Sequence, residues 1–439
     1  MLNDTICAIS TSLSESAISI VRLSGDESFD IVKKITNIKE IKPNTIVYSH
    51  VYEKDEVLDE VMISFFKAPK SYTREDMVEI NTHGGVYITR KILNLLLSMG
   101  VRLAEPGEFT KRAYLNGRID LSKAESVNDM IKARNEIQSK SAIRGLNGSI
   151  ERLLTPLMNE IKDVISMIEV NIDYPEYDDV TQMTNEKIKP YLIKWINDAK
   201  VMINKAERFR VVKDGLNTVI IGKPNVGKSS LLNALLEQDK AIVTDVAGTT
   251  RDLVEGVVNL ENITLNLIDT AGIRESKDIV EKIGIERSKA ALENADLVIL
   301  VLDSSNIDEE DEKLLDLTKD KNRIIVNNKS DLNAIGDIKI SAKNNDIKEL
   351  VSYLNNKYAN DVKLVDEDVL NNERQLSLMK RALNEFEEML KDIDNAELDV
   401  VEINLEEAFH YLSDILGSEY KEDLIDHMFR NFCLGKWYE

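Results

Sequence analysis

The chain has 439 residues, enough for two or three domains that each bury a core of their own. Lysine and arginine total 56 against 78 aspartate and glutamate residues, giving a net charge of −22. This charge excludes a broad basic surface for nucleic acid, so any RNA contact must be local or shared with a partner. The sequence has no uncharged apolar run of membrane-spanning length and no signal peptide, which predicts a cytoplasmic protein without membrane association.

Residues 1–117 are predicted to form a mixed α/β domain, because apolar alternation indicates strands and three-and-four spacing indicates helices. The Gly84-Gly85 pair favours a tight turn over an anion site. The expected strands are Thr5–Ala8, Ala17–Leu23, Val61–Phe66 and Met77–Asn81, and the expected helices are Ser28–Ile35 and Val86–Met99.

Residues 118–213 and 361–439 are predicted to be the two halves of one helical domain. The first half begins at a capping box, Ser122–Glu125, breaks between Gly145 and Gly148, and stops near Tyr174-Pro175. A second helix is expected from about 186 to 208. The intervening residues 214–360 form an inserted domain, so any movement of the insert pushes on the helices.

The insert opens with a phosphate loop. Gly222–Ser229 reads GKPNVGKS, a full match to G-x-x-x-x-G-K-[ST], between the apolar run Val219–Ile221 and a helix. The glycines let backbone N–H groups point at a phosphate, Lys228 adds a point charge, and the Ser229 hydroxyl can bind Mg²⁺. Alternating strands and helices predict a doubly wound, mostly parallel sheet.

Three further loops follow apolar strands and predict a guanine-nucleotide site. Asp269–Gly272 can hold magnesium-bound water and contact a terminal phosphate, Asn328–Asp331 is an N-K-x-D pattern that reads guanine, and Ser341–Lys343 supports the base. The predicted GTP-binding residues are Asn225, Val226, Gly227, Lys228, Ser229, Ser230, Thr244, Asp245, Val246, Ala247, Gly248, Thr249, Thr250, Asp269, Thr270, Ala271, Gly272, Asn328, Lys329, Asp331, Ser341, Ala342 and Lys343.

Two usual parts of a GTPase are missing from the sequence. Ile273 stands where many small GTPases have a water-orienting glutamine. Arg274, Glu275 and Glu281 are candidate replacements, and the alternative for each is a solvated surface charge. No arginine finger is evident. Asn225 and the switch loop 244–252 instead offer oxygen ligands for K⁺, while Thr250 would join Ser229 on Mg²⁺.

Several long motifs in order make the whole chain resemble the MnmE (TrmE) family of tRNA modification GTPases, of the potassium-activated TrmE-Era-Der type. These motifs are DTICAIST, ISIVRLSG, EDMVEINTHGG, RLAEPGEFTKRAYLNGRIDLSKAESV, GKPNVGKSSLLNAL, AIVTDVAGTTRD, DTAGIR, VEKIGIERS and FCLGK.

The resemblance implies a homodimer whose N-terminal domain has a tetrahydrofolate-binding fold and carries 5-formyltetrahydrofolate or another one-carbon folate. It implies that Glu281 is the catalytic glutamate and that Cys433 lies near the folate. Arg251 and Arg274 are further functional candidates. The implied folate contacts are Arg22, Glu79, Arg118 and Lys436, and the implied K⁺ ligands are Asn225, Thr244, Val246 and Thr249.

The family acts with the FAD-dependent partner MnmG (GidA), in a heterotetramer or larger complex. Together they place an aminomethyl or carboxymethylaminomethyl group on C5 of the wobble uridine of certain tRNAs. This sequence departs from the family pattern in two places. The chain continues past Lys436 as Trp437-Tyr438-Glu439, whereas the family usually stops at that lysine, and Arg118 stands at a position where the family also has lysine. A ribosome-assembly GTPase and a folate-binding scaffold with vestigial hydrolysis are the alternative readings.

Overall fold

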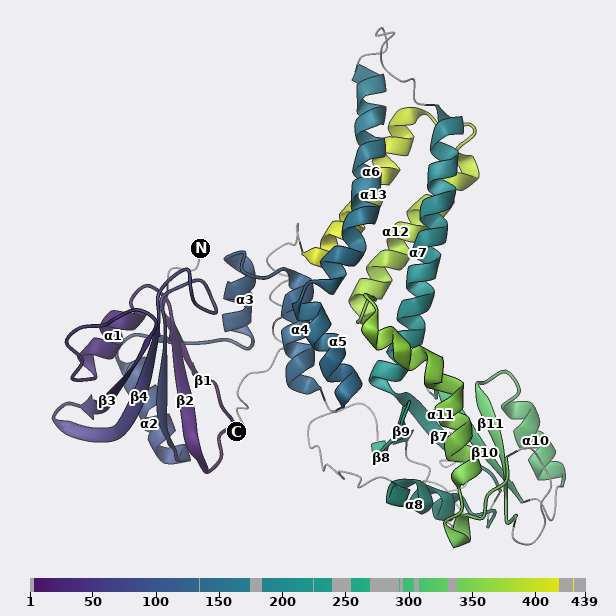
Figure 1. Ribbon diagram of the computed structural model, residues 1–439, viewed down its shortest axis with the longest axis horizontal. Coiled ribbons are helices and arrows are strands. Elements are labelled where there is room, and N and C mark those ends of the chain that lie inside the picture. The colour runs from purple at the N-terminus through teal and green to yellow at the C-terminus, as the bar shows by residue number, and fades with distance from the viewer. Residues whose placement is uncertain are drawn as a thin grey trace, which may run out of the picture. The chain divides into compact units, whose positions relative to one another are not determined.

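Figure 1 shows the computed structural model with its helices and strands. The chain divides into two compact units. Unit 1 comprises Met1–Ala133, Ala142–Ile188 and Asn384–Glu439, and unit 2 comprises Arg134–Ser141 and Lys189–Leu383. The structure describes residues 4–133, 135–173, 184–223, 225–238, 254–268, 292, 295–303, 308–330, 338–417 and 429. No helix within these ranges is long and apolar enough to cross a bilayer.

Unit 1 contains a six-stranded sheet with the order β3-β4-β5-β2-β1-β6. The β1–β6 pair is parallel and the other neighbouring pairs are antiparallel. The four strands expected from the sequence are confirmed as β1, β2, β4 and β5, whereas β3 and β6 were not predicted. The strands are β1 (Ile6–Ile9), β2 (Ser16–Ser24), β3 (Thr45–Glu53), β4 (Glu56–Phe66), β5 (Met77–Gly84) and β6 (Arg102–Leu103).

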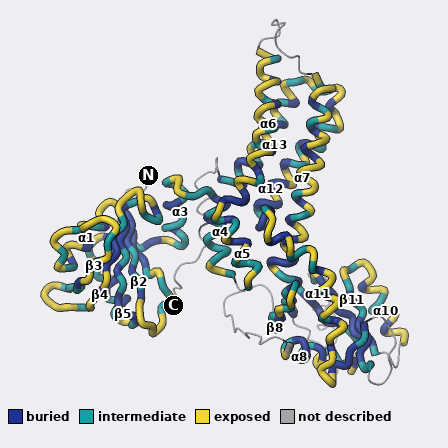
Figure 2. The backbone as a smooth tube through the Cα atoms, in the orientation of Figure 1, coloured by how far each residue is buried: buried dark blue, intermediate teal, exposed yellow. Residues whose placement is uncertain are grey.

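Two helices, α1 (Ser28–Lys34) and α2 (Val86–Ser98), pack against one face of this sheet. Their buried side chains meet inward-facing strand residues such as Val21 and Ile80. Because side chains alternate along a strand, Arg22 and Glu79 belong to the opposite face. Figure 2 shows that buried residues concentrate along the strands of this sheet.

Helix α3 (Glu108–Leu115) is fixed by a buried ion-pair network. Arg112 is 1% exposed and donates to Asp4 Oδ1 at 2.7 Å and to Glu108 Oε1 at 3.0 Å. Burial opposes ionisation of Glu108, but hydrogen bonds led by that from Arg102 outweigh it and lower its pKa. The network thereby ties α3 to the beginning of β1.

The helical region follows α3. In unit 1, α13 packs along α6 (Figure 1), with apolar residues at three-and-four spacing on both helices. The predicted break at 145–148 is confirmed between α5 and α6. The helices are α4 (Leu121–Lys132), α5 (Glu136–Leu146), α6 (Ser149–Asp173), α7 (Asn185–Asp214), α12 (Glu373–Asp392) and α13 (Leu398–Leu416).

The capping box expected at Ser122 is wrong. Helix α4 begins at Leu121, and its N-cap is Asp120, whose side chain accepts from the Lys123 N–H at 2.9 Å. Ser122 lies inside the helix and donates its hydroxyl to Asp120 at 2.6 Å. Aspartate caps a helix as well as serine does, and a cap at Asp120 makes the fully buried Leu121 the first helical residue, where it packs with Ala124.

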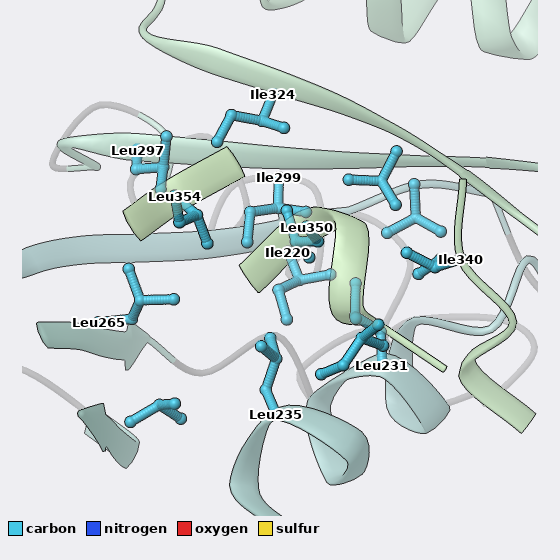
Figure 3. Close-up of a cluster of buried hydrophobic side chains, with 14 of the residues drawn as sticks. Ile220, Leu231, Leu235, Leu265, Leu297, Ile299, Ile324, Ile340, Leu350 and Leu354 are labelled. Atoms are coloured by element: carbon cyan, nitrogen blue, oxygen red, sulfur yellow. The ribbon is translucent and has the colours of Figure 1, made fainter. Parts of the chain in front are cut away.

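Unit 2 contains a second sheet, with the order β11-β10-β7-β9-β8, in which only β8 runs antiparallel to its neighbour. Helices α8 and α11 pack against one face (Figure 3) and α10 against the other, which confirms the doubly wound prediction. The elements are β7 (Leu216–Ile221), α8 (Lys228–Gln238), β8 (Val254–Asn259), β9 (Thr264–Ile268), β10 (Leu297–Asp303), α10 (Glu309–Leu317), β11 (Arg323–Asn328), the 3₁₀ turns η2 (Ala342–Asn344) and η3 (Lys363–Asp366), and α11 (Lys348–Val362).

The cap of α4 can be tested with Asp120→Ala. Loss of an N-cap costs about 1 kcal/mol, so amide exchange in the first turn of α4 should accelerate about fivefold in hydrogen–deuterium exchange. Ser122→Ala is the matched control, because it keeps the Asp120 bond to Lys123. Faster exchange in the serine variant than in the aspartate variant would restore Ser122 as the cap.

Candidate functional site

The phosphate loop connects the end of β7 to the start of α8. Gly222 has φ +156°, and a Cβ there would lie 2.4 Å from the Val301 carbonyl oxygen. Gly227 has φ +100°, and a Cβ there would lie 2.2 Å from Asn328 Nδ2. Both glycines are therefore required by close approach of neighbouring strand ends as well as by backbone conformation.

Lys228 begins α8 and turns back over the loop. Its Nζ donates to the carbonyls of Gly222 at 2.9 Å and Lys223 at 2.7 Å. Burial lowers the pKa of Lys228, since desolvation disfavours the charged form. Ser229 is exposed in the first turn of α8, so its hydroxyl is accessible to a ligand at the positive end of the helix.

Asn328 links the phosphate loop to the predicted base loop. Its side chain is at the end of β11, and the residue is only 3% exposed. The amide nitrogen donates to the Val226 carbonyl at 2.7 Å, and the amide oxygen accepts from the Ala342 N–H at 3.0 Å. One buried side chain thus brings together three loops that the sequence assigned to nucleotide binding.

Two lysines of these loops are held by carboxylates around the β10–α10 connection. Lys329, with φ +61°, pairs with Asp303 at the end of β10. Lys223 pairs with Asp308 at 2.7 Å and with the fully buried Asp311 at 2.6 Å. Sequence reasoning missed these anchors, because the carboxylates come from a segment without a nucleotide motif.

The remaining described residues of the predicted nucleotide site lie in the same loops. Asn225 adopts φ +62°, a left-handed conformation that is uncommon outside glycine. Ser341 donates its backbone N–H to the main-chain carbonyl of Asp346 at 2.9 Å, which closes the turn containing Lys343. Val226 is buried, whereas Ser230 is exposed on α8.

Many predicted site residues lie outside the described ranges. They include the whole predicted switch loop, the D-T-A-G stretch and the guanine-reading aspartate. These residues are Thr244, Asp245, Val246, Ala247, Gly248, Thr249, Thr250, Arg251, Asp269, Thr270, Ala271, Gly272, Arg274, Glu281, Asp331, Cys433 and Lys436.

Three of the four predicted folate contacts line one cavity of about 1460 Å³ in unit 1, and the fourth lies outside the described ranges. Arg22 and Glu79 are cross-strand partners on β2 and β5, with Arg22 Nη2 2.7 Å from Glu79 Oε1. Arg118 donates to the Tyr72 carbonyl at 2.9 Å and lies 4.7 Å from the centre of the Tyr72 ring.

The residues that line the cavity fit the groups of the folate expected from the sequence. Glu79 provides a carboxylate acceptor for ring N–H groups, Tyr72 and Phe109 provide aromatic surface, and the arginines suit carboxylates. The Arg22 guanidinium lies 5.4 Å from the Phe109 ring centre and 5.8 Å from that of Tyr72. Sequence reasoning missed both aromatic residues, because isolated aromatics outside strands carry no periodic pattern.

Two family models match the chain. "GTP-binding protein TrmE N-terminus" matches residues 5–118, and "MnmE helical domain" matches residues 121–433. The chain is 46% identical to the tRNA modification GTPase MnmE of Streptococcus thermophilus, covering 99% of this chain and 98% of that one. The Lactococcus lactis MnmE has the same identity and coverage.

Among solved structures, the G domain of the T. maritima FeoB iron transporter is 30% identical to the matching part of the chain. The alignment covers 33% of this chain and 98% of that domain, with a TM-score of 0.25. The family assignment accordingly rests on the sequence relatives.

The contact between Gly227 and Asn328 can be tested with Gly227→Ala. The added methyl group would displace the Asn328 amide and break both of its buried hydrogen bonds. At about 1–3 kcal/mol for each bond, affinity for a fluorescent GDP analogue should fall about 30-fold or more. Gly100→Ala is the control, since Gly100 has φ +90° but open space around its Cβ position. Equal, small effects of both variants would contradict the contact.

Proposed function

The chain belongs to the MnmE family of tRNA modification GTPases, and from this premise we propose that its GTP hydrolysis supports the modification of a wobble uridine. The protein is a GTP hydrolase that acts in tRNA modification. With an FAD-dependent partner, MnmG (GidA), it adds an aminomethyl or carboxymethylaminomethyl group to C5 of the wobble uridine. The homodimer and the partner form a heterotetramer or a larger complex.

The observation that carries the GTPase part of this proposal is the Asn328 bridge. By binding Val226 and Ala342 together, Asn328 holds a phosphate-binding loop and a base-supporting loop at fixed spacing. A nucleotide that spans both loops fits this arrangement. In the proposal Asp331 reads guanine, while Asp269 and Gly272 serve the terminal phosphate.

The proposed GTP site uses Mg²⁺ and K⁺. Ser229, accessible in the first turn of α8, and Thr250 would hold Mg²⁺, which neutralises phosphate charge. Asn225 has an amide oxygen suited to K⁺, and Thr244, Val246 and Thr249 would complete that site. The cation would supply charge where other GTPases use an arginine finger.

Glu281 is the proposed water-positioning residue. Ile273 cannot orient water, because its side chain is apolar. A carboxylate can accept a hydrogen bond from the attacking water and hold it in line with the phosphate. In the proposal, Glu281 takes this position when two G domains of the dimer pair. Arg251 and Arg274 are further functional candidates.

The cavity of unit 1 is proposed to bind a one-carbon folate such as 5-formyltetrahydrofolate. Arg22, Glu79 and Arg118 line it, and Lys436 is proposed to reach it together with Cys433. When bound, the folate supplies a one-carbon unit. The proposed domain boundaries are 1–117 for the folate domain, 214–360 for the G domain, and 118–213 with 361–439 for the helical domain.

Deletion of the gene that encodes this protein tests its proposed role in modification of the tRNA wobble uridine. Nucleoside mass spectrometry of total tRNA should show loss of the aminomethyl and carboxymethylaminomethyl wobble uridines. Re-expression of the Lys228→Ala variant should fail to restore them, because that variant lacks the phosphate-loop charge. Unchanged wobble nucleosides with altered ribosomal subunits would support an assembly GTPase instead.

Potassium dependence is tested by GTP turnover in KCl and NaCl at equal ionic strength and several protein concentrations. We expect turnover about 100-fold faster in KCl, rising with G-domain pairing. Asn225→Gly is the variant of choice, since glycine accepts the φ of +62° and removes only the amide. It should bind GDP normally and lose the K⁺ response. Equal wild-type rates in both salts would exclude the K⁺ site.

A further inference from the structure

We propose that the cavity of unit 1 takes a folate whose tail carries several γ-linked glutamates, and that Lys70 and Arg74 bind the additional carboxylates beside Arg118. This inference rests on the proposed binding of a folate, and it adds that the bound folate has a tail of several glutamates. It assigns two residues that no sequence motif singled out.

The charge of the cavity wall points to a polyanion. Four basic side chains line the cavity, against two acidic ones, in a chain whose net charge is −22. One of the acids, Glu79, is already paired with Arg22 at 2.7 Å. Lys70, Arg74 and Arg118 therefore outnumber the remaining carboxylate, Glu105, and attract anions to this wall.

The two guanidinium groups of this wall are positioned by the backbone. Arg118 donates to the Tyr72 carbonyl and Arg74 donates to the Asn116 carbonyl, both at 2.9 Å. The Asn116 side-chain amide also donates to the Thr73 carbonyl at 2.7 Å. These three bonds join the turn that carries Arg74 to the turn that carries Arg118. Each arginine uses one nitrogen in this way and keeps further N–H donors.

The backbone at Arg74 is also unusual. Its φ of +61° is a left-handed conformation that costs energy for a residue with a side chain. The reciprocal bonds between the turns maintain this conformation. Lys70 lies four residues earlier in the same loop and lines the same cavity, so it adds a third charge to the wall.

The size of the cavity fits a long ligand. Its volume of about 1460 Å³ exceeds the roughly 300–1000 Å³ typical of small-molecule pockets. In the proposed function, the Glu79 carboxylate and the aromatic side chains bind the ring, which leaves the basic residues for the tail. A single terminal glutamate has two carboxylates, whereas the wall offers three cations, and each added γ-linked glutamate brings one more carboxylate within the same chemistry.

The test is calorimetric titration of the full chain with the monoglutamate and the triglutamate of 5-formyltetrahydrofolate. Wild-type protein should bind the triglutamate about five- to tenfold more tightly at low ionic strength, and the preference should shrink in high salt. The preference for the triglutamate should shrink in Arg74→Gln and disappear in the double variant Lys70→Gln with Arg74→Gln. In both variants the affinity for the monoglutamate should change little.

Lys54→Gln is the matched control. Lys54 is an exposed basic residue with φ +56° in another turn of the same domain, and it does not line the cavity. It should keep the full preference for the triglutamate. Equal wild-type affinities for both ligands would overturn the tail site while leaving folate binding intact. Failure of both ligands to bind would overturn the folate proposal and the tail site together.

Discussion

The nucleotide-binding half of the molecule depends on one buried amide. Asn328 satisfies its donor and its acceptor within a space that is closed to water, and each bond ends on a different loop. An unpaired amide at this depth would cost about 1–3 kcal/mol of stability. Separation of either loop from Asn328 would incur this cost, so the amide favours the arrangement in which both loops contact it. The same contact explains Gly227, since any side chain there would occupy the position of the amide nitrogen.

Much of unit 2 could be predicted because its information is local. A strand, a glycine loop and a helix follow one another from β7 to α8, and each nucleotide-binding motif follows a buried strand.

Strand β3 of unit 1 was not predicted, for a physical reason. Val47 and Val51 point into the core, but Ile46 and Tyr48 are apolar and exposed on the other face, so the alternation disappears.

The residues that line the cavity of unit 1 were harder to predict from sequence patterns. Arg22 and Glu79 face each other only because β2 and β5 pair in one register, and no spacing along the chain encodes that register. They were found through family resemblance. Tyr72, Arg74 and Phe109 were not found, because they come from separate segments. Tyr72 and Arg74 lie in the loop between β4 and β5, where Arg74 is held by its bond to the Asn116 carbonyl, and Phe109 lies in the first turn of α3.

The packing of α13 on α6 has a consequence for biosynthesis. A ribosome makes a chain from its N-terminus, so α6 emerges long before α13, with residues 174–397 made in between. Until then the apolar stripe of α6, which includes Leu154 and Ile161, lacks its final cover. Burial of this stripe against α13 therefore has to wait until residues 398–416 have been made, after synthesis of the whole nucleotide-binding fold, so the stripe stays exposed for most of translation.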